Sequence, residues 1–495
     1  MTGKFVRLFS ISLGLIFFFS SFVIAIPADP NFSFEITQPD GKNVTLKPAG
    51  DERFGYYQTL DGYTVIKSSD GWYYYASLDS QGALVTTATK VYSPKDRPKA
   101  SIQFLDTQTT QIKPSTQNRL YPDVKLQPEL LTQSALAATD TVTNNVLVIL
   151  IEFSDYSGIY DSSDFDNLMN QPGYDVYGSA HDYYEECSYG QFNLQGDIDG
   201  WYKTENEHFL YGYNDGNNWA AAAVLAREAI EMATIYSDID FSKYDNNGDG
   251  EVDGLFIVHA GPGAETGASD FPWSHKWSLS DAGLSPITAD GVTIDAYTME
   301  PEIHSGVDIA HIGVFVHEYG HALGLPDLYD TDGSSNGIGM WGVMAGGSWG
   351  GAGKSPVHFS GWSKAQLGWT NPINITTDTT GIILPDASTS PISYRLWTDG
   401  MPSSQYFLVE NRGKTNFDAF LPGCGVAIWH IDDAVNGNSN EAHRKVDLEE
   451  GDNSENNSSG DVWINKIFGV STVPNSSDYL GDSTSVRVVV HSTTC

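Results

Sequence analysis

The stretch His-Glu-Tyr-Gly-His at residues 317–321 combines side chains that can hold a metal ion and use it in catalysis. His317 and His321 are four positions apart, so on a helix both imidazoles leave one face, one turn apart. Two neutral imidazoles in this arrangement can bind one Zn²⁺. Glu318 is then placed to take a proton from water that the metal activates. The motif predicts hydrolysis of a polarised carbonyl, and an ordinary helix with surface histidines is the alternative.

A catalytic zinc needs three protein ligands and one open coordination position. Gly324 comes three residues after His321, where a glycine can end a helix in the left-handed conformation. The chain can then turn back toward the metal, so that Asp327 supplies the third ligand. A carboxylate from elsewhere, Glu302 or Glu410, remains the rival for this position.

A methionine follows in the glycine-rich stretch GIGMWGVMAGGSWGG at residues 337–351. Met344 lies about twenty residues after the second histidine, which resembles the Met-turn beneath the metal of metzincin proteases. An ordinary core methionine is the alternative, because a lone methionine is a weak signal. Together with the histidines and Asp327, Met344 favours a metzincin-like site.

A second metal site is predicted in the loop DNNGDGEVD at residues 245–253. Oxygen ligands alternate along it, Gly250 stands at the sharp turn, and residue 251 offers its carbonyl, as in a calcium-binding loop. Position 12 is Phe256, so the bidentate glutamate of an EF-hand is missing. We expect a structural Ca²⁺ site rather than a plain Asn/Gly turn, with these ligands: Asp245, Asn247, Asp249, Glu251 and Asp253.

The surrounding pattern predicts the elements that must position these residues. Continuous apolar runs at 144–155 and 254–261 indicate buried strands, and residues 178–190 and 218–236 have helical composition and spacing. Strand, helix and strand in this order indicate an α/β lobe with the histidine motif on a later helix. We assign residues 141–371 to the catalytic domain.

The N-terminal part has the layout of a secreted precursor. Residues 1–25 have two cations and then a long apolar run, which predicts a signal peptide cut between Ala25 and Ile26. Residues 30–98 alternate apolar and polar letters around Asp-Gly and Gln-Gly pairs, the pattern of β-hairpins. Residues 99–142 are rich in Gln, Thr, Ser and Pro and predict an exposed linker. Residues 26–140 are thus a predicted pro-segment and linker.

The pro-segment should block the metal site if the protein is made as a zymogen. The three cysteines are Cys187, Cys424 and Cys495, so a pro-segment thiolate is excluded as the blocking group. A carboxylate, or a strand laid along the cleft, remains possible. The same three cysteines allow at most one intramolecular disulfide.

Short β runs recur from residue 372 to the C-terminus and predict a β-rich region, either a subdomain of the catalytic domain or a separate sandwich. His430 in this region could support the metal site from a second layer of contacts. It could equally be a satisfied histidine in a buried strand.

The composition narrows the possible partners. Lys and Arg number 26 and Asp and Glu number 63, so the net charge is −37. Such a chain repels nucleic acid and anionic membranes. No stretch after the signal peptide is long and apolar enough to span a bilayer. We expect a secreted, extracellular monomer that acts on proteins or peptides.

Several motifs together resemble the M6 family of secreted metallopeptidases, the immune inhibitor A type: VHEYGHALGLPDLYD, GMWGVMAGGSWGG, YFLVENR, GVAIWHIDD and HRKVDLEEGD. The resemblance implies a zinc endopeptidase made as a zymogen, with His317, His321 and Asp327 as ligands and Glu318 as general base. The expected fold class is α+β: a metzincin-like catalytic domain between a β-rich pro-segment and a β-rich C-terminal module. A non-catalytic, calcium-dependent extracellular adhesin with a protease-like lobe is the alternative function.

Overall fold

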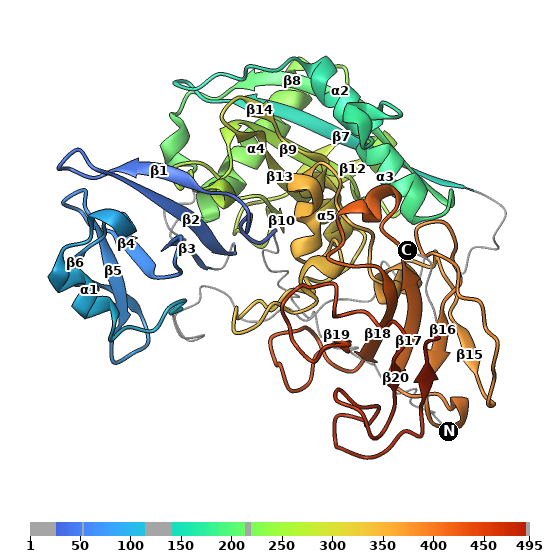
Figure 1. The fold of residues 1–495 in the computed structure, drawn as a ribbon. Coiled ribbons are helices and arrows are strands. Elements are labelled where there is room, and N and C mark those ends of the chain that lie inside the picture. The colour runs from blue at the N-terminus through green and yellow to red at the C-terminus, as the bar shows by residue number, and fades with distance from the viewer. Residues whose placement is uncertain (1–25, 52–53, 114–140, 213–218, 492–495) are drawn as a thin grey trace, which may run out of the picture.

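The computed structural model describes residues 26–51, 54–113, 141–212 and 219–491, and Figure 1 shows three regions along the chain. The predicted signal peptide and most of the predicted linker lie outside the described residues. An N-terminal sheet lies on one side, a larger layered region occupies the top and centre, and a C-terminal sheet lies below it (Figure 1).

The N-terminal sheet is antiparallel and has its six strands in sequence order. Each of the four predicted turns joins two strands, and each turn glycine has a positive φ, as at Gly41 (81°) and Gly62 (86°). The strands are β1 (Phe34–Thr37), β2 (Asn43–Asp51), β3 (Phe54–Thr59), β4 (Thr64–Lys67), β5 (Tyr73–Leu78) and β6 (Leu84–Lys90).

The start of the predicted linker is a helix, which corrects the sequence analysis. Helix α1 (Lys99–Leu105) packs on the sheet, with the Phe104 ring 6.2 Å from that of Tyr75. Further on, the nitrogen of Gln111 donates to the carbonyl of Gly62 at 2.7 Å. The segment is rich in Gln and Thr, so its composition predicts a linker. Its apolar residues Phe104 and Leu105 nevertheless pack the short helix against the sheet.

The central sheet has the order β10-β13-β9-β7-β8, with β14 paired to β13. Strands β8, β7, β9 and β13 are parallel neighbours, and β10 is an antiparallel edge. Its strands are β7 (Val142–Glu152), β8 (Phe192–Lys203), β9 (Leu255–Pro262), β10 (His275–Ser278), β13 (Ala296–Ser305) and β14 (Asp308–Ile309), with a separate hairpin of β11 (Ile287–Ala289) and β12 (Val292–Ile294).

Helices cover both faces of this sheet because β7 is apolar on both sides. Leu147, Ile149 and Ile151 belong to the core under α4 (Trp219–Tyr236). Val146, Val148 and Leu150 belong to a second core on the opposite face. Three helices lie on that second face: α2 (Ser162–Asn170), α3 (Ala180–Cys187) and α5 (Ile312–Ala322). The mixed arrangement fits an α+β protease domain, and α5 carries the histidine motif.

The C-terminal region follows the short helix α6 (Gly361–Gln366). Its five-stranded sheet shares the second core with the central region, so it is a subdomain rather than a separate sandwich. Arg412, for example, donates to the carbonyl of Trp341 at 3.0 Å. The strands are β15 (Ile373–Ile375), β16 (Tyr394–Leu396), β17 (Gln405–Arg412), β18 (Gly425–Asp432) and β19 (Val446–Leu448), with a further pair of β20 (Ile467–Phe468) and β21 (Val488–Val489).

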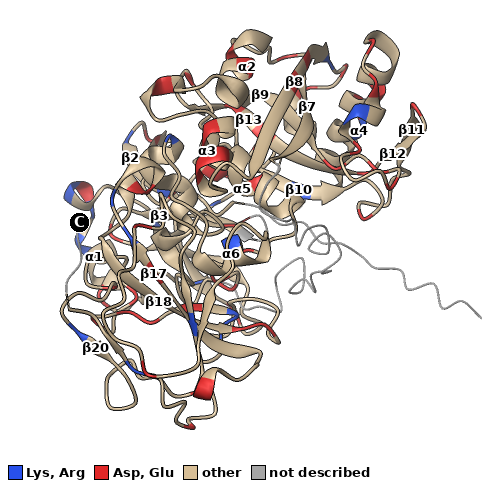
Figure 2. Cartoon of the chain, turned by 90° about the vertical axis from the view of Figure 1, so that its right-hand side faces the viewer, with Lys and Arg blue, Asp and Glu red and all other residues tan. Residues whose placement is uncertain are grey.

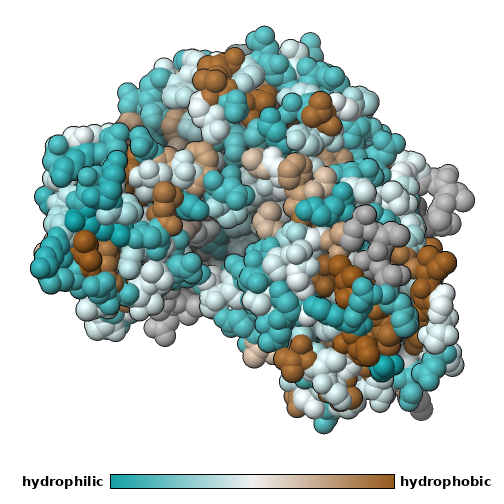
Figure 3. Space-filling view, viewed as in Figure 1, coloured by the Kyte–Doolittle hydropathy of each residue, from teal (hydrophilic) through white to brown (hydrophobic). Residues whose placement is uncertain are grey.

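The surface is acidic and mostly hydrophilic. Figure 2 shows Asp and Glu spread over all three regions, in keeping with the excess of acidic residues. Apolar patches are scattered over the face seen in Figure 3, which is indented between the N-terminal sheet and the C-terminal region. Within the described part of the chain, every helix is too short or too polar to cross a bilayer.

Candidate metal centre

The helix α5 is buried along almost its whole length, which fixes the direction of its two histidines. Residues 312–321 are all buried. The helix ends at Ala322 with Leu323 as its C-cap, and Gly324 follows with a φ of 91°, as the sequence analysis expects. The nitrogen of Leu325 then donates to the carbonyl of Gly320 at 3.1 Å, which turns the chain back along the helix.

This turn brings Asp327 to the two histidines. The Nε2 atoms of His317 and His321 are 3.1 Å apart. Oδ1 of Asp327 lies 3.3 Å from the first and 3.2 Å from the second. Four ligands about 2.0 to 2.1 Å from a tetrahedral zinc are separated from one another by about 3.3 to 3.4 Å. The three atoms are therefore spaced as ligands of one ion.

The outer nitrogens of both imidazoles face backbone carbonyls. Nδ1 of His317 is 2.7 Å from the carbonyl of Val343, and Nδ1 of His321 is 2.8 Å from that of Leu325. A carbonyl only accepts, so Nδ1 must carry the proton and Nε2 presents a lone pair. Two lone pairs at 3.1 Å repel each other unless a cation lies between them. Burial also lowers the pKa of His321, despite the opposing effect of Asp327 beside it, which favours the neutral form.

The two rival carboxylates have other partners. Oε1 of Glu302 accepts from the nitrogens of Ile159 and Tyr160, and its Oε2 from Gly261. Oε1 of Glu410 accepts from the indole of Trp429 at 3.0 Å. Neither joins the group of His317, His321 and Asp327, which is one of three possible metal-binding groups among the described residues.

Met344 packs under the metal helix. A Cβ built at Gly320 would lie 2.5 Å from the sulfur of Met344, so the helix approaches the methionine closely only because residue 320 is a glycine. The carbonyl of Met344 accepts from the nitrogen of Leu328 at 2.7 Å, next to Asp327. The turn therefore contacts both helix α5 and the chain next to Asp327.

Glu318 meets the start of the described chain. The main-chain nitrogen of Ile26 donates to Oε1 of Glu318 at 2.8 Å, and Ile26 is fully buried. The indole N–H groups of two tryptophans donate to main-chain carbonyls of this segment. Trp273 donates to the carbonyl of Ile26 and Trp349 to that of Pro27, both at 2.9 Å. The sequence analysis missed both tryptophans, because nothing in their neighbourhoods distinguishes a cleft residue from a core residue.

The same segment continues past a second pair of histidines. Oδ2 of Asp29 lies 3.7 Å from Nε2 of His304, whose ring centroid is 4.4 Å from that of His311 at a tilt of 35°. Burial lowers the pKa of His304 to about 4 and raises that of Asp29. At neutral pH a neutral imidazole therefore faces this carboxylate.

Comparisons with known proteins indicate the family to which the central region is similar. A family model described as the catalytic domain of immune inhibitor A peptidase M6 matches residues 132–370. The chain therefore carries an M6 metallopeptidase catalytic domain. Immune inhibitor A from Bacillus thuringiensis subsp. alesti is 32% identical over 288 residues, which cover 46% of this chain and 39% of that protein. Pre-pro-metalloprotease PrtV from Vibrio cholerae is 32% identical over 277 residues, 46% of this chain and 30% of that protein. The chain thus spans less than half the length of these relatives.

Likeness to solved structures is weak. OgpA from Akkermansia muciniphila matches with a TM-score of 0.25 and 12% identity, over 61% of this chain and 93% of that chain. Metalloproteinase-II from Bacteroides fragilis matches with a TM-score of 0.23 and 11% identity, over 66% and 86%. Neither overlap carries an argument about the M6 domain.

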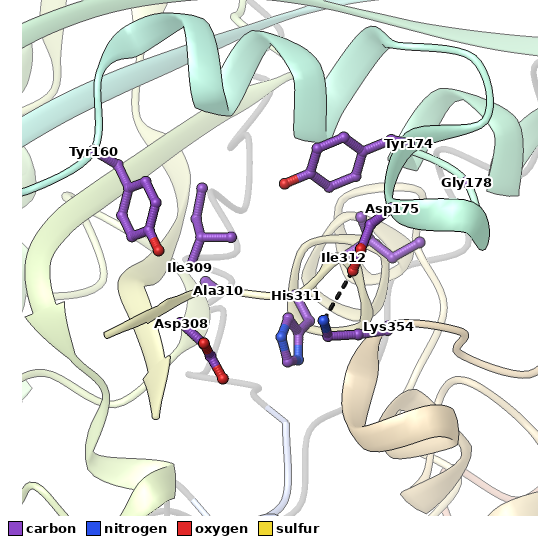
Figure 4. A pocket seen from close by; sticks show the side chains of 10 residues that line it. All are labelled: Tyr160, Tyr174, Asp175, Gly178, Asp308, Ile309, Ala310, His311, Ile312 and Lys354. Carbon is purple, nitrogen blue, oxygen red and sulfur yellow. Dashed lines mark hydrogen bonds and ion pairs between the residues drawn. The ribbon is translucent and has the colours of Figure 1, made fainter. Parts of the chain in front are cut away.

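A pocket of about 180 Å³ adjoins the M6 domain's second histidine pair. Figure 4 shows His311 and Lys354 at one end of it, with Lys354 directed toward Asp175. The ammonium and this carboxylate are 2.9 Å apart, so the pocket's lysine is already paired. Tyr160 and Tyr174 lie at the opposite side of the opening (Figure 4).

His430 lies away from the metal group. It is buried in β18, its ring is stacked 4.1 Å from that of Tyr479, and its Nδ1 is 3.1 Å from Oε1 of Glu449. These partners all belong to the C-terminal subdomain. The structure therefore does not bring His430 to His317, His321 or Asp327.

The loop 245–253 leads into β9 of the M6 domain, with a φ of 91° at Gly250. Two of its carboxylates accept hydrogen bonds from the loop's own backbone: Oδ1 of Asp245 from the nitrogen of Gly248 at 2.7 Å, and Oδ2 of Asp253 from that of Asn246 at 2.7 Å. None of the three metal-binding groups found among the described residues includes this loop. The calcium ligands therefore stay a prediction.

The cysteines differ in state. Cys424 is disulfide-bonded, and Cys187 is a buried free thiol in α3 of the M6 domain. Cys495 lies outside the described residues.

Proposed function

We propose that this protein is a secreted zinc endopeptidase made as a zymogen. The observation that carries the proposal is the convergence of His317, His321 and Asp327, with Glu318 on the same helix. A bound Zn²⁺ would polarise the scissile carbonyl and activate water. Glu318 would take a proton from that water and pass it to the leaving nitrogen. The substrates are proteins or peptides, and the acidic surface argues against nucleic acid as a partner.

The decisive experiment is hydrolysis of casein by the processed protein. We expect activity that a chelator abolishes and that Glu318→Gln reduces by several orders of magnitude. The variant should keep one zinc per chain, because Glu318 is not a ligand. If processed protein with a full complement of zinc cuts no peptide, the endopeptidase proposal fails and the adhesin alternative gains support.

Latency is the second part of the proposal, with residues 26–140 as pro-segment and linker and residues 141–371 as catalytic domain. Support comes from the segment Ile26–Asp29, whose first nitrogen donates to Oε1 of Glu318 and would keep that oxygen from acting as the general base. If the signal peptide is cut between Ala25 and Ile26, that nitrogen becomes a cationic amine beside a carboxylate. A hydrogen bond between two charged groups is stronger than the neutral amide–carboxylate contact it would replace.

A structural calcium site in the loop 245–253 is the third part. Support comes from the alternation of oxygen donors and from the turn at Gly250. Calcium should raise the melting temperature of the processed protein, and Asp249→Ala should remove that increment. An equal increment in the variant would contradict the site.

A further inference from the structure

Two tryptophans contact consecutive carbonyls of the segment in the cleft. Nε1 of Trp273 donates to the carbonyl of Ile26, and Nε1 of Trp349 to the carbonyl of Pro27. Both indoles are almost fully buried, at 3% and 1% exposure. When residues 26–29 leave the cleft, each N–H loses the carbonyl it now binds. Both N–H groups then face the space that the segment vacates, where each can donate to the carbonyl of another chain.

The direction of the segment follows from its contact with Glu318. In peptide hydrolysis the general base delivers its proton to the leaving nitrogen. The nitrogen that contacts Glu318 is that of Ile26, so this residue occupies the place of the first substrate residue after the scissile bond. Pro27 then occupies the place of the second.

We propose that Trp273 and Trp349 bind the main-chain carbonyls of the first and second substrate residues after the scissile bond. The inference rests on the proposed peptidase function and names its substrate class. These are polypeptides that continue for at least two residues beyond the cut, whatever their side chains. Proline is accepted at the second position, because Pro27 occupies that place and has no N–H to offer.

Both indoles are held in place by the protein and not only by the bound segment. Ser274, next to Trp273, is anchored by Glu265, whose Oε1 accepts from its hydroxyl at 2.7 Å. Trp349 lies in the 3-10 segment Gly346–Gly353, which packs on α5: a Cβ at Gly313 would lie 2.2 Å from the carbonyl of Ser348. The donors are therefore positioned relative to Glu318 before a substrate arrives, which reduces the entropy lost on binding.

The test compares two fluorogenic peptides with the same sequence before the scissile bond. One ends after a single residue capped as the methylamide, and the other continues for three residues. Trp349→Phe keeps an aromatic ring but loses the donor. We expect its kcat/KM to fall about 2- to 13-fold on the longer peptide, the worth of one neutral hydrogen bond, and to stay unchanged on the shorter one. Trp273→Phe should lower kcat/KM on both, since both retain the first carbonyl.

Trp362→Phe is the matched control. Trp362 lies on helix α6, and its indole donates to Asp433 at 2.9 Å rather than to residues 26–29. This variant should treat the two peptides as the unsubstituted enzyme does. As a second readout, the amide of Ile-Pro-Ala-Asp should bind the processed protein, with Kd raised by Trp349→Phe. Equal effects of Trp349→Phe on both peptides, or none on either, would overturn the inference. If the unsubstituted, zinc-loaded enzyme cuts neither peptide, the proposed function itself fails.

Discussion

The main-chain nitrogen of Ile26 binds Oε1 of Glu318 across 292 positions of sequence. The contact joins the first residue after the predicted signal cleavage to the predicted general base. It depends on the N-terminal sheet, since the nitrogen of Ala28 donates to the carbonyl of Gly50 at the end of β2. The sheet also contacts the central region where the hydroxyl of Tyr57 donates to the carbonyl of Gly267.

Removing Ile26–Asp29 should therefore release activity without processing. The unprocessed variant is expected to hydrolyse a small fluorogenic peptide that the unprocessed parent leaves intact, because Glu318 and the cleft become accessible. One glycine added before Ile26 should weaken latency by displacing the terminal amine. Gln81→Ala, in the turn between β5 and β6, is the control and should stay latent. A deletion variant that has normal zinc content but hydrolyses no peptide would contradict this role of the segment.

Asp327→Ala should abolish stoichiometric zinc, because a carboxylate that faces both Nε2 atoms is removed. Loss of one of three ligands should weaken binding by at least about 100-fold, a larger effect than the 10- to 100-fold typical of outer-shell changes. Metal analysis after dialysis checks this. Glu410→Gln, which keeps an acceptor for the indole of Trp429, is the control and should retain the metal. If Asp327→Ala retained the metal and Glu410→Gln lost it, Glu410 would be the third ligand instead.

Gly320→Ala should destabilise the protein because the new methyl group meets the sulfur of Met344 at 2.5 Å. Overpacking of this kind costs about 1 to 3 kcal/mol, or roughly 2 to 10 °C in melting temperature for a domain of this size. At Gly437 a Cβ has nothing within 4 Å, so Gly437→Ala is the matched control. If the two variants have the same melting temperature, the close approach of helix α5 to Met344 is wrong.

Asp253 should make stability depend on pH in calcium-free buffer. Burial raises the pKa of this carboxyl to about 6 in the folded protein. A raised pKa means that the folded state binds the proton more tightly, so the gain is present below the ordinary range of an aspartate and is lost as pH rises through about 6. The melting temperature relative to Asp253→Asn should thus fall between about pH 4 and 6 and level off above about pH 7.

The exposed residue Asp378 supplies the control for this pH dependence. Asp378→Asn should follow the unsubstituted protein in parallel over the same range. Bound calcium favours the ionised carboxylate and should weaken the trend. A pH-independent difference between the unsubstituted protein and Asp253→Asn would contradict the raised pKa.

The M6 domain could be predicted from sequence because its signals are local. The histidines, Gly324 and Asp327 lie within eleven residues, where helix geometry and one glycine determine their relative positions. The contacts of Trp273, Trp349 and Ile26 join distant segments, and no periodicity or spacing encodes such pairs. The choice between Glu302, Glu410 and Asp327 needed the fold for the same reason.

The core shared by the central region and the C-terminal sheet also affects how this protein could be engineered. The indole of Trp341, beside the Met-turn, donates to Asp461, 120 positions further on. A gene fragment that stops at residue 370, where the family match ends, would leave the floor of the metal site facing water. Domain swaps among M6-like proteins should therefore carry the chain from β15 through Asp461 along with helix α5, since the family match ends inside a shared hydrophobic core.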